Sequence, residues 1–268
     1  MNSYEKLTEA IKRSDSLLCI GLDSDISRLP ESVEKSLSGL FLFNLKIIEA
    51  TRSFASAYKL NFAFYEQYGS EGFVVLKETI NSIPEDKFII ADAKRGDIGN
   101  TSKAYAKSVF EYFKADAITV SPYMGSDSLK PFLEYDDKMI FVLALTSNPG
   151  SKDFQRLQCE GKPLFQQVIE TTSEYGNKYN TGYVVGATHP EDLKLIRKII
   201  PEHYLLIPGV GTQGGDVHAV LDANAGGPVI INVSRDIIYS SGLEIFAEAA
   251  AQKAEYYKDL FKINNGFF

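Results

Sequence analysis

The segment Phe88-Ile-Ile-Ala-Asp-Ala-Lys-Arg-Gly-Asp-Ile-Gly-Asn-Thr101 joins an apolar run to a cluster of charges. Its apolar part, Phe88 to Ala91, has the length and composition of a buried strand. Asp92, Lys94 and Asp97 follow at once. Charged groups beside a core strand are costly unless each is paired or used. We therefore interpret the chain as a scaffold that holds these charges and brings an anionic small molecule to them.

Short apolar runs of this kind recur along the chain. Runs rich in Ile, Val, Leu or aromatic residues, without polar alternation, are typical of parallel strands covered by helices. We expect eight strands, at Ser16–Asp23, Ala55–Asn61, Lys87–Ala93, Ala115–Ser121, Met139–Thr146, Thr181–Ala187, Tyr204–Gly209 and Pro228–Ser234.

Segments with apolar residues three and four positions apart lie between these runs and predict helices. They are Leu40–Phe54, Gly69–Ile83, Gly99–Phe113, Ser126–Leu133, Lys162–Tyr175, Pro190–Ile199, Gly214–Ala223 and Gly242–Phe261. Asn100, Ser126 and Pro190 are residue types that mark helix starts, and Gly176 is one that marks a helix end.

The alternation of strands and helices predicts the fold class. Eight β–α pairs in 268 residues favour a single-domain (β/α)₈ TIM barrel spanning residues 1–268, with an N-terminal helix at 1–15 and a short tail at 262–268. An open doubly wound sheet is the alternative. A chain of this length would normally divide such a sheet into two domains, and we find no composition shift or linker to mark a division.

Composition excludes several functional classes. A net charge of −7 and a pI near 5.1 argue against sequence-independent binding of nucleic acid or of an anionic membrane. No apolar run has the ~20 residues that span a bilayer, and the N-terminus lacks the features of a signal peptide. The two cysteines, Cys19 and Cys159, indicate neither a disulfide framework nor a metal site. We expect a cytoplasmic protein.

Polar residues follow many of the predicted strands, where barrel enzymes place their chemistry. Asp92 and Lys94 share one face of an extended strand, and Lys59 ends the second strand. Two lysines and two aspartates at one end of a barrel would perturb one another's pKa values strongly. The structural alternative is an ion pair at the rim, with Asp97 as an acid near a helix N-terminus.

A phosphate site is predicted at the last two loops. Leu206-Ile-Pro-Gly-Val-Gly-Thr-Gln-Gly-Gly215 follows the seventh strand, and its glycines let backbone N–H groups surround a phosphate. Arg235 ends the eighth strand, which matches the phosphate site that barrels build after strands seven and eight. Arg235 could instead form a rim salt bridge. Asp23 could bind a sugar hydroxyl or cap a turn, and the long loop Thr146–Gly161 favours a lid.

At this point the chain resembles the orotidine 5′-phosphate decarboxylase family, in its longer bacterial form. The resemblance runs from about Leu18 to Ile238. Asp92–Thr101 matches the family's Asp-x-Lys-x-x-Asp signature and its continuation. Further matches, in the expected order, are Tyr58-Lys-Leu-Asn61, Thr146-Ser-Asn-Pro-Gly150, Pro208-Gly-Val-Gly-Thr-Gln213 and Asn232-Val-Ser-Arg235.

The resemblance implies a role for each matching residue. Lys59, Asp92, Lys94 and Asp97 resemble the family's charged tetrad, with Lys94 as proton donor. It also implies a homodimer with shared sites and no metal or organic cofactor. The implied contacts are listed by substrate part: Asp23 and Lys59 for the ribose, Ser147 for the pyrimidine, Gly209, Gly211, Gln213 and Arg235 for the phosphate, and Asp97, Ile98 and Thr101 in the partner subunit's site.

Three alternatives remain open at this point. A sister barrel enzyme that uses the same signature with Mg²⁺, such as a hexulose-phosphate synthase or a keto-gulonate-phosphate decarboxylase, would carry an acidic metal ligand near the end of strand two, where this chain has Lys59. A Schiff-base aldolase would use Lys59 or Lys94. A catalytically silent phosphate-binding barrel would leave the four charges unexplained.

Overall fold

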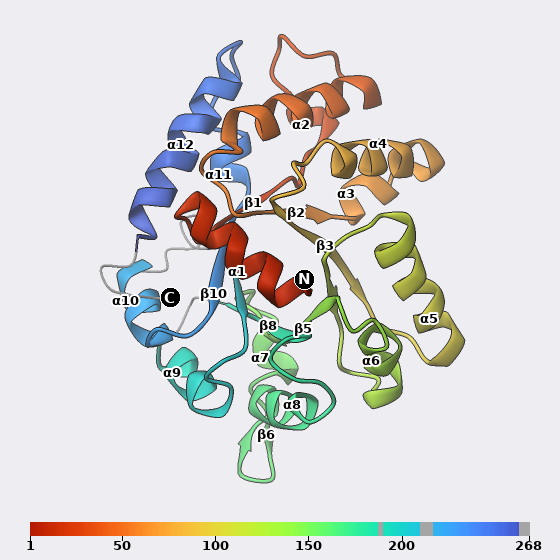
Figure 1. Cartoon of the computed structure of the whole chain (residues 1–268), viewed down its shortest axis with the longest axis vertical. Coiled ribbons are helices and arrows are strands. Elements are labelled where there is room, and N and C mark those ends of the chain that lie inside the picture. The colour runs from red at the N-terminus through yellow and green to blue at the C-terminus, as the bar shows by residue number, and fades with distance from the viewer. Residues whose placement is uncertain (187–189, 210–216, 263–268) are drawn as a thin grey trace. The chain divides into compact units, whose positions relative to one another are not determined.

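A computed structural model describes residues 1–186, 190–209 and 217–262. Eight strands form a closed barrel in the order β1-β10-β9-β8-β5-β4-β3-β2 (Figure 1). The neighbouring pairs β1–β2, β2–β3, β4–β5, β5–β8 and β8–β9 are parallel. The barrel strands are β1 (Leu18–Gly21), β2 (Ala57–Asn61), β3 (Phe88–Arg95), β4 (Ala117–Val120), β5 (Met139–Leu145), β8 (Thr181–Val185), β9 (Leu205–Pro208) and β10 (Val229–Val233). The expected (β/α)₈ barrel is confirmed, and each predicted strand contains one of these except the third, because β3 runs two residues beyond Ala93.

Helices alternate with the strands, as the periodicity predicts. The longer ones are α1 (Ser3–Ser14), α2 (Leu37–Thr51), α4 (Gly69–Asn81), α5 (Gly99–Lys107), α6 (Ser126–Leu133), α8 (Leu164–Ser173), α9 (Pro190–Ile199), α10 (Val217–Asn224) and α12 (Phe246–Leu260). Shorter helices are η1 (Ile26–Arg28), α3 (Ala63–Glu66), α7 (Ser151–Phe154) and α11 (Arg235–Ile238). The helix expected over Gly99–Phe113 is divided, because a π-helical turn, η2 (Ser108–Tyr112), follows α5. None of the helices in the described ranges is long and apolar enough to cross a bilayer.

Two of the residues expected to mark helix ends, Asn100 and Gly176, do not do so. The N-cap of α5 is Ile98, two residues before the expected Asn100, although the helix begins at Gly99, as the predicted range does. Gly176 does not end α8, whose C-cap is Glu174. A Cβ at Gly176 would lie 2.3 Å from the Thr181 hydroxyl, so this glycine allows a close approach to β8. Pro190, in contrast, is the first residue of α9, as predicted.

The chain forms two compact units. The first, residues 6–93 and 232–262, is called the β1–β2 unit here. Its helix α2 packs against α4 and α12 (Figure 1). Phe43 of α2 stacks on Phe246 of α12, with ring centroids 5.2 Å apart. Buried aromatic pairs of this kind add about 0.5–1.5 kcal/mol beyond the area that they bury, so they fix α2 and α12 together.

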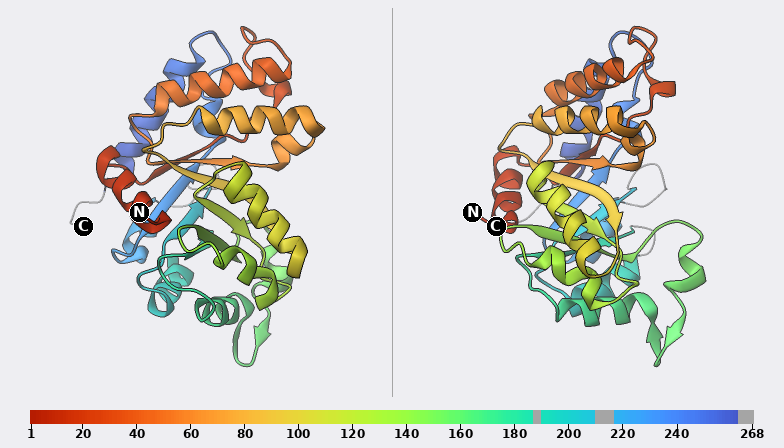
Figure 2. Two further views of the ribbon diagram at one scale, coloured as in Figure 1. Left: turned by 45° about the vertical axis from the view of Figure 1, so that its right-hand side comes forward. Right: turned by 90° about the vertical axis from the view of Figure 1, so that its right-hand side faces the viewer.

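The second unit comprises the described residues of 1–5 and 94–231, and is called the β4–β9 unit. Its core strands β4, β5 and β8 are almost wholly buried. The long connection after β5 is not without secondary structure, since it contains α7 and a hairpin of β6 (Gln158–Cys159) and β7 (Lys162–Pro163). Figure 2 shows this hairpin extending away from α8. Sequence periodicity missed it because two-residue strands are too short to show alternation.

Candidate active site

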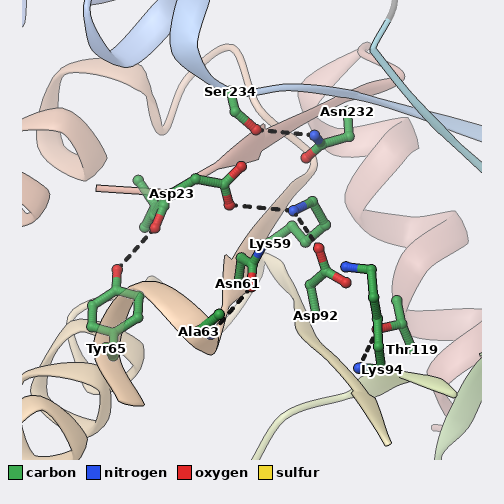
Figure 3. A network of polar contacts seen from close by, with 11 residues as sticks. Asp23, Lys59, Asn61, Ala63, Tyr65, Asp92, Lys94, Thr119, Asn232 and Ser234 are labelled. Atoms are coloured by element: carbon green, nitrogen blue, oxygen red, sulfur yellow. Dashed lines mark hydrogen bonds and ion pairs between the residues drawn. The ribbon is translucent and has the colours of Figure 1, made fainter. Parts of the chain in front are cut away.

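A buried lysine lies between two carboxylates in the β1–β2 unit (Figure 3). Lys59 of β2 is 4% exposed, and its Nζ lies 2.9 Å from Asp92 Oδ2 and 3.4 Å from Asp23 Oδ1. The three residues come from three strands, because Asp92 is in β3 and Asp23 follows β1. The register that pairs Gly21 with Lys59, and Lys59 with Ile90, places these strand ends next to one another.

Electrostatics fix the charge of Lys59. Burial alone would lower its pKa, since it disfavours the charged form, but the carboxylates of Asp23 and Asp92 outweigh this and raise the pKa above its ordinary value. The ammonium is therefore retained at neutral pH. It can donate hydrogen bonds and attract an anion, but it has no lone pair with which to attack a carbonyl.

The backbone of Lys94 departs from strand geometry. Its φ is 47°, although β3 extends to Arg95. The alternation of an extended strand therefore does not by itself set the direction of this side chain, and the expectation that Asp92 and Lys94 share one face stays a prediction. In the β4–β9 unit the Lys94 N–H donates to the Thr119 hydroxyl at 3.0 Å. A non-glycine residue held at positive φ is uncommon and is often found at functional sites.

The residues predicted for a shared site lie at the start of α5 in the β4–β9 unit. The Asp97 carboxylate accepts a hydrogen bond from the Ile98 N–H at 2.8 Å, and the Asp97 carbonyl oxygen accepts one from Ser102 at 2.5 Å. Ile98 is 51% exposed and Thr101 is also exposed on the single chain. An exposed isoleucine beside a half-buried aspartate is compatible with burial against a second subunit.

Ser147, the predicted pyrimidine contact, is half-buried after β5. Close approach of the backbone after β8 fixes its place, because a Cβ at Gly186 would lie 2.8 Å from the Ser147 N. The base of the long loop is closed by Thr146 and Gln155. The Thr146 N–H donates to Gln155 Oε1 at 2.7 Å, and Gln155 Nε2 donates to the Thr146 hydroxyl at 2.9 Å.

The predicted phosphate site is described only in part. Gly209 follows β9 with a φ of 82°, a conformation that favours glycine. Arg235 is exposed and is the first residue of α11 in the β1–β2 unit. Gly211 and Gln213 lie outside the described residues, as does His189.

Sequence reasoning assigned no separate role to Asn232 or Ser234, two residues of the same strand end. Asn232 Nδ2 donates to the Ser234 hydroxyl at 3.1 Å (Figure 3). A Cβ at Gly21 would lie 1.9 Å from that hydroxyl, so the pair requires a glycine in β1. The only sequence signal for it was the Asn-Val-Ser-Arg motif, which does not say which atoms meet.

These features define the class of protein. It is a (β/α)₈ barrel that holds a charged lysine between two carboxylates near the ends of its strands, the region where barrel enzymes place their chemistry. The profile of the orotidine 5′-phosphate decarboxylase / HUMPS family matches residues 16–250. The chain belongs to this family, which confirms the resemblance.

Individual relatives agree with the family match. Orotidine 5′-phosphate decarboxylase of Herpetosiphon aurantiacus is 50% identical over 253 residues, which are 94% of this chain and 94% of that protein. The solved structure of Leishmania donovani OMP decarboxylase is 39% identical with a TM-score of 0.82, and the match covers 97% of this chain and 99% of that one. Leishmania donovani UMP synthase is 40% identical with a TM-score of 0.84, and the match covers 96% of this chain but 57% of that one.

Proposed function

We propose that this protein decarboxylates orotidine 5′-phosphate to UMP in de novo pyrimidine biosynthesis, without a metal or organic cofactor. The observation that carries the proposal is the buried Asp23–Lys59–Asp92 arrangement, followed two residues later by Lys94. The relatives named as orotidine 5′-phosphate decarboxylases support the same substrate.

In the proposed reaction Lys94 is the proton donor. The bond between C6 of the pyrimidine and its carboxyl carbon breaks, CO₂ leaves, and the electron pair stays on C6. The Lys94 ammonium stabilises this developing charge and transfers one proton to C6, after which the amine takes a proton from water. Lys94 is the better donor of the two lysines because the carboxylates that raise the pKa of Lys59 also hold its proton.

Asp92 and Lys59 prepare the site for that step. The Asp92 carboxylate, 2.9 Å from Lys59, would lie beside the substrate carboxylate and disfavour the ground state or orient Lys94. Asp23 and Lys59 would contact the ribose. Arg235, with the loop that contains Gly209, Gly211 and Gln213, would bind the phosphate, and Ser147 the pyrimidine. Binding energy from the phosphate would then promote the reaction at C6.

The proposal includes a homodimer with shared active sites. Asp97, Ile98 and Thr101 would reach into the partner's site from the start of α5. The exposure of Ile98 in the single chain supports this, because an apolar side chain in that position gains free energy when a second subunit covers it.

Lys59 also argues against the two enzymatic alternatives. A magnesium-dependent sister enzyme needs an acidic ligand near the end of β2, and a permanently charged ammonium there repels a cation. A Schiff base at Lys59 needs a neutral amine, which the raised pKa disfavours. Borohydride trapping in the presence of substrate tests the Schiff base at Lys94.

The function is tested by following the loss of orotidine 5′-phosphate absorbance in the presence of EDTA. We expect full turnover with the chelator. Absence of turnover, or its loss on adding EDTA, contradicts the proposal. Lys94→Ala should lower kcat by orders of magnitude with the fold intact, and near wild-type activity would refute the assignment of the proton donor.

The shared site is tested by subunit exchange between Lys94→Ala and Asp97→Ala, each expected to be inactive alone. A hybrid dimer has one site with both substitutions and one site with neither. Random exchange should therefore restore activity to about a quarter of the sites, since half of the dimers are hybrids. Exchanged mixtures that remain inactive would contradict sharing.

A further inference from the structure

The segment that carries Asp23, Leu22 to Asp25, is held by hydrogen bonds on both sides of that residue. The Leu22 N–H donates to the Lys59 carbonyl oxygen at 2.8 Å, and the Leu22 carbonyl oxygen accepts from the Tyr65 hydroxyl at 2.9 Å. The Asp25 N–H donates to the Tyr239 hydroxyl at 2.7 Å. The backbone before and after Asp23 is thus fixed to two tyrosines and to β2.

Asn44 of α2 connects the hydrogen bonds on the two sides of Asp23. It is fully buried, and its Oδ1 accepts from the Ser24 hydroxyl at 2.6 Å. Its Nδ2 donates to the Tyr65 hydroxyl at 3.1 Å and to the Thr79 hydroxyl at 3.2 Å. One carboxamide therefore connects the residue after Asp23 directly, and the residue before it through Tyr65.

We propose that Asn44 is a positioning residue that sets the Asp23 carboxylate against Lys59 through Ser24 and Tyr65. Every polar atom of the Asn44 side chain has a hydrogen-bond partner, and a satisfied buried network holds one geometry well. The Asp23 side chain is 17% exposed, and its carboxylate has lone pairs beyond the one that faces Lys59, so it can accept a second donor. A substrate hydroxyl is the donor that this arrangement fits.

This inference rests on the proposed function, because the donor in question is the substrate ribose. If Asn44 only stabilised the fold, its replacement would reduce stability and leave binding unchanged. If it positions Asp23, its replacement weakens substrate binding in the molecules that are folded. The inference is therefore tested by kinetics and stability on the same variants.

The experiment measures KM and kcat for orotidine 5′-phosphate, and the urea midpoint, for Asn44→Ala, Asp23→Asn and the double variant. We expect Asn44→Ala to raise KM roughly tenfold or more, the effect of about one lost hydrogen bond, with a smaller change in kcat. In the Asp23→Asn background the same substitution should change KM less than threefold, because the group that it positions is gone. Equal effects in both backgrounds would overturn the inference.

Two milder variants keep the test decisive where Asn44→Ala fails to fold. Ser24→Ala removes the bond to Asn44 Oδ1, and Tyr65→Phe removes the bonds to Asn44 and Leu22. Each substitution should raise KM when made in the wild-type protein. It should not raise KM further when made in the Asp23→Asn variant. Unchanged KM in both would refute the inference.

The matched control is Thr51→Val, at another buried polar residue of α2. Its hydroxyl donates to the Ile47 carbonyl oxygen at 2.7 Å and lies 2.9 Å from the Tyr58 hydroxyl. We expect a lower urea midpoint and an unchanged KM. A KM raised as much as in Asn44→Ala would mean that Asn44 is only structural. If Asp23→Asn leaves KM unchanged, the proposed ribose contact is wrong. If the wild-type protein does not turn over orotidine 5′-phosphate, the proposed function itself fails.

Discussion

Replacing Lys59 by Met tests the electrostatics of the site most directly. Lys59 is 4% exposed and lies between carboxylates at 2.9 and 3.4 Å. Methionine fills a similar volume but removes the ammonium that lies 2.9 Å from Asp92, a side chain that is itself 8% exposed. Breaking a buried ion pair by removing one partner costs about 3–5 kcal/mol, since the remaining charge stays desolvated. We expect a loss of that size in the free energy of unfolding at pH 7.

The pH dependence of the loss identifies its cause. In Lys59→Met the buried Asp92 carboxylate loses the nearby ammonium that favours its charged form, so its pKa should rise above its value in the unfolded chain. Between the pKa of this carboxyl in the unfolded chain and its higher pKa in the folded protein, the folded protein binds more protons than the unfolded one. The contribution of this group to stability is therefore greatest below the unfolded-state pKa and is lost as the pH rises through the folded-state pKa. The deficit relative to wild type should therefore be smaller at pH 5 than at pH 7.

Urea unfolding at the two pH values measures both quantities, and Lys103→Met is the control. The Lys103–Glu134 pair is separated by 3.5 Å, with both side chains more than half exposed. Exposed pairs of this kind contribute about 0–1 kcal/mol. A loss below ~1 kcal/mol for Lys59→Met at pH 7, or one that does not change with pH, would refute the reasoning.

Three further substitutions have outcomes that can be measured. Gly21→Ala places a Cβ 1.9 Å from the Ser234 hydroxyl. It should lower the free energy of unfolding in urea by about 1–3 kcal/mol and raise KM, and wild-type values of both would contradict this. Burial lowers the pKa of His203 to about 4, so the stability of the wild-type protein should fall as the pH drops from about 6.5 to 4. Thermal unfolding of His203→Phe should not show this pH dependence. Thr119→Val removes the acceptor of the Lys94 N–H and should lower kcat about 5–30-fold. An unchanged kcat would show that this hydrogen bond does not matter for the reaction.

The strands were predictable because most of their residues are buried and apolar. Phe88 to Ala91 shows this pattern, and β3 begins at Phe88. Helix ends were less predictable, since they depend on single residues. The N-cap of α5 is Ile98 and not the expected Asn100, and Gly176 allows a close approach to β8 that no local pattern reveals.

Some features of the candidate site were likewise predictable from the sequence, and others were not. Motifs identified Lys59, Asp92 and Lys94, and the strand register explains why Lys59 meets Asp92 across neighbouring strands. The hydrogen bonds of Asn44 could not be predicted, because its partners lie 20 to 35 residues away and polar residues in an amphipathic helix are usually solvent-exposed. Nor does any sequence pattern indicate the positive φ of Lys94.

The two lysines of the proposed site have environments that suit different roles. Lys59 is buried between carboxylates that raise its pKa, so it stays charged and gives up its proton poorly. Lys94 is exposed in the single chain and carries the strained backbone. Strain of this kind costs about 1–3 kcal/mol and persists only when the surroundings enforce it. The hydrogen bond from its N–H to Thr119 is one such constraint. A fixed charge at Lys59 and a backbone-constrained ammonium at Lys94 together provide what the proposed reaction needs, an electrostatic anchor and a separate proton donor.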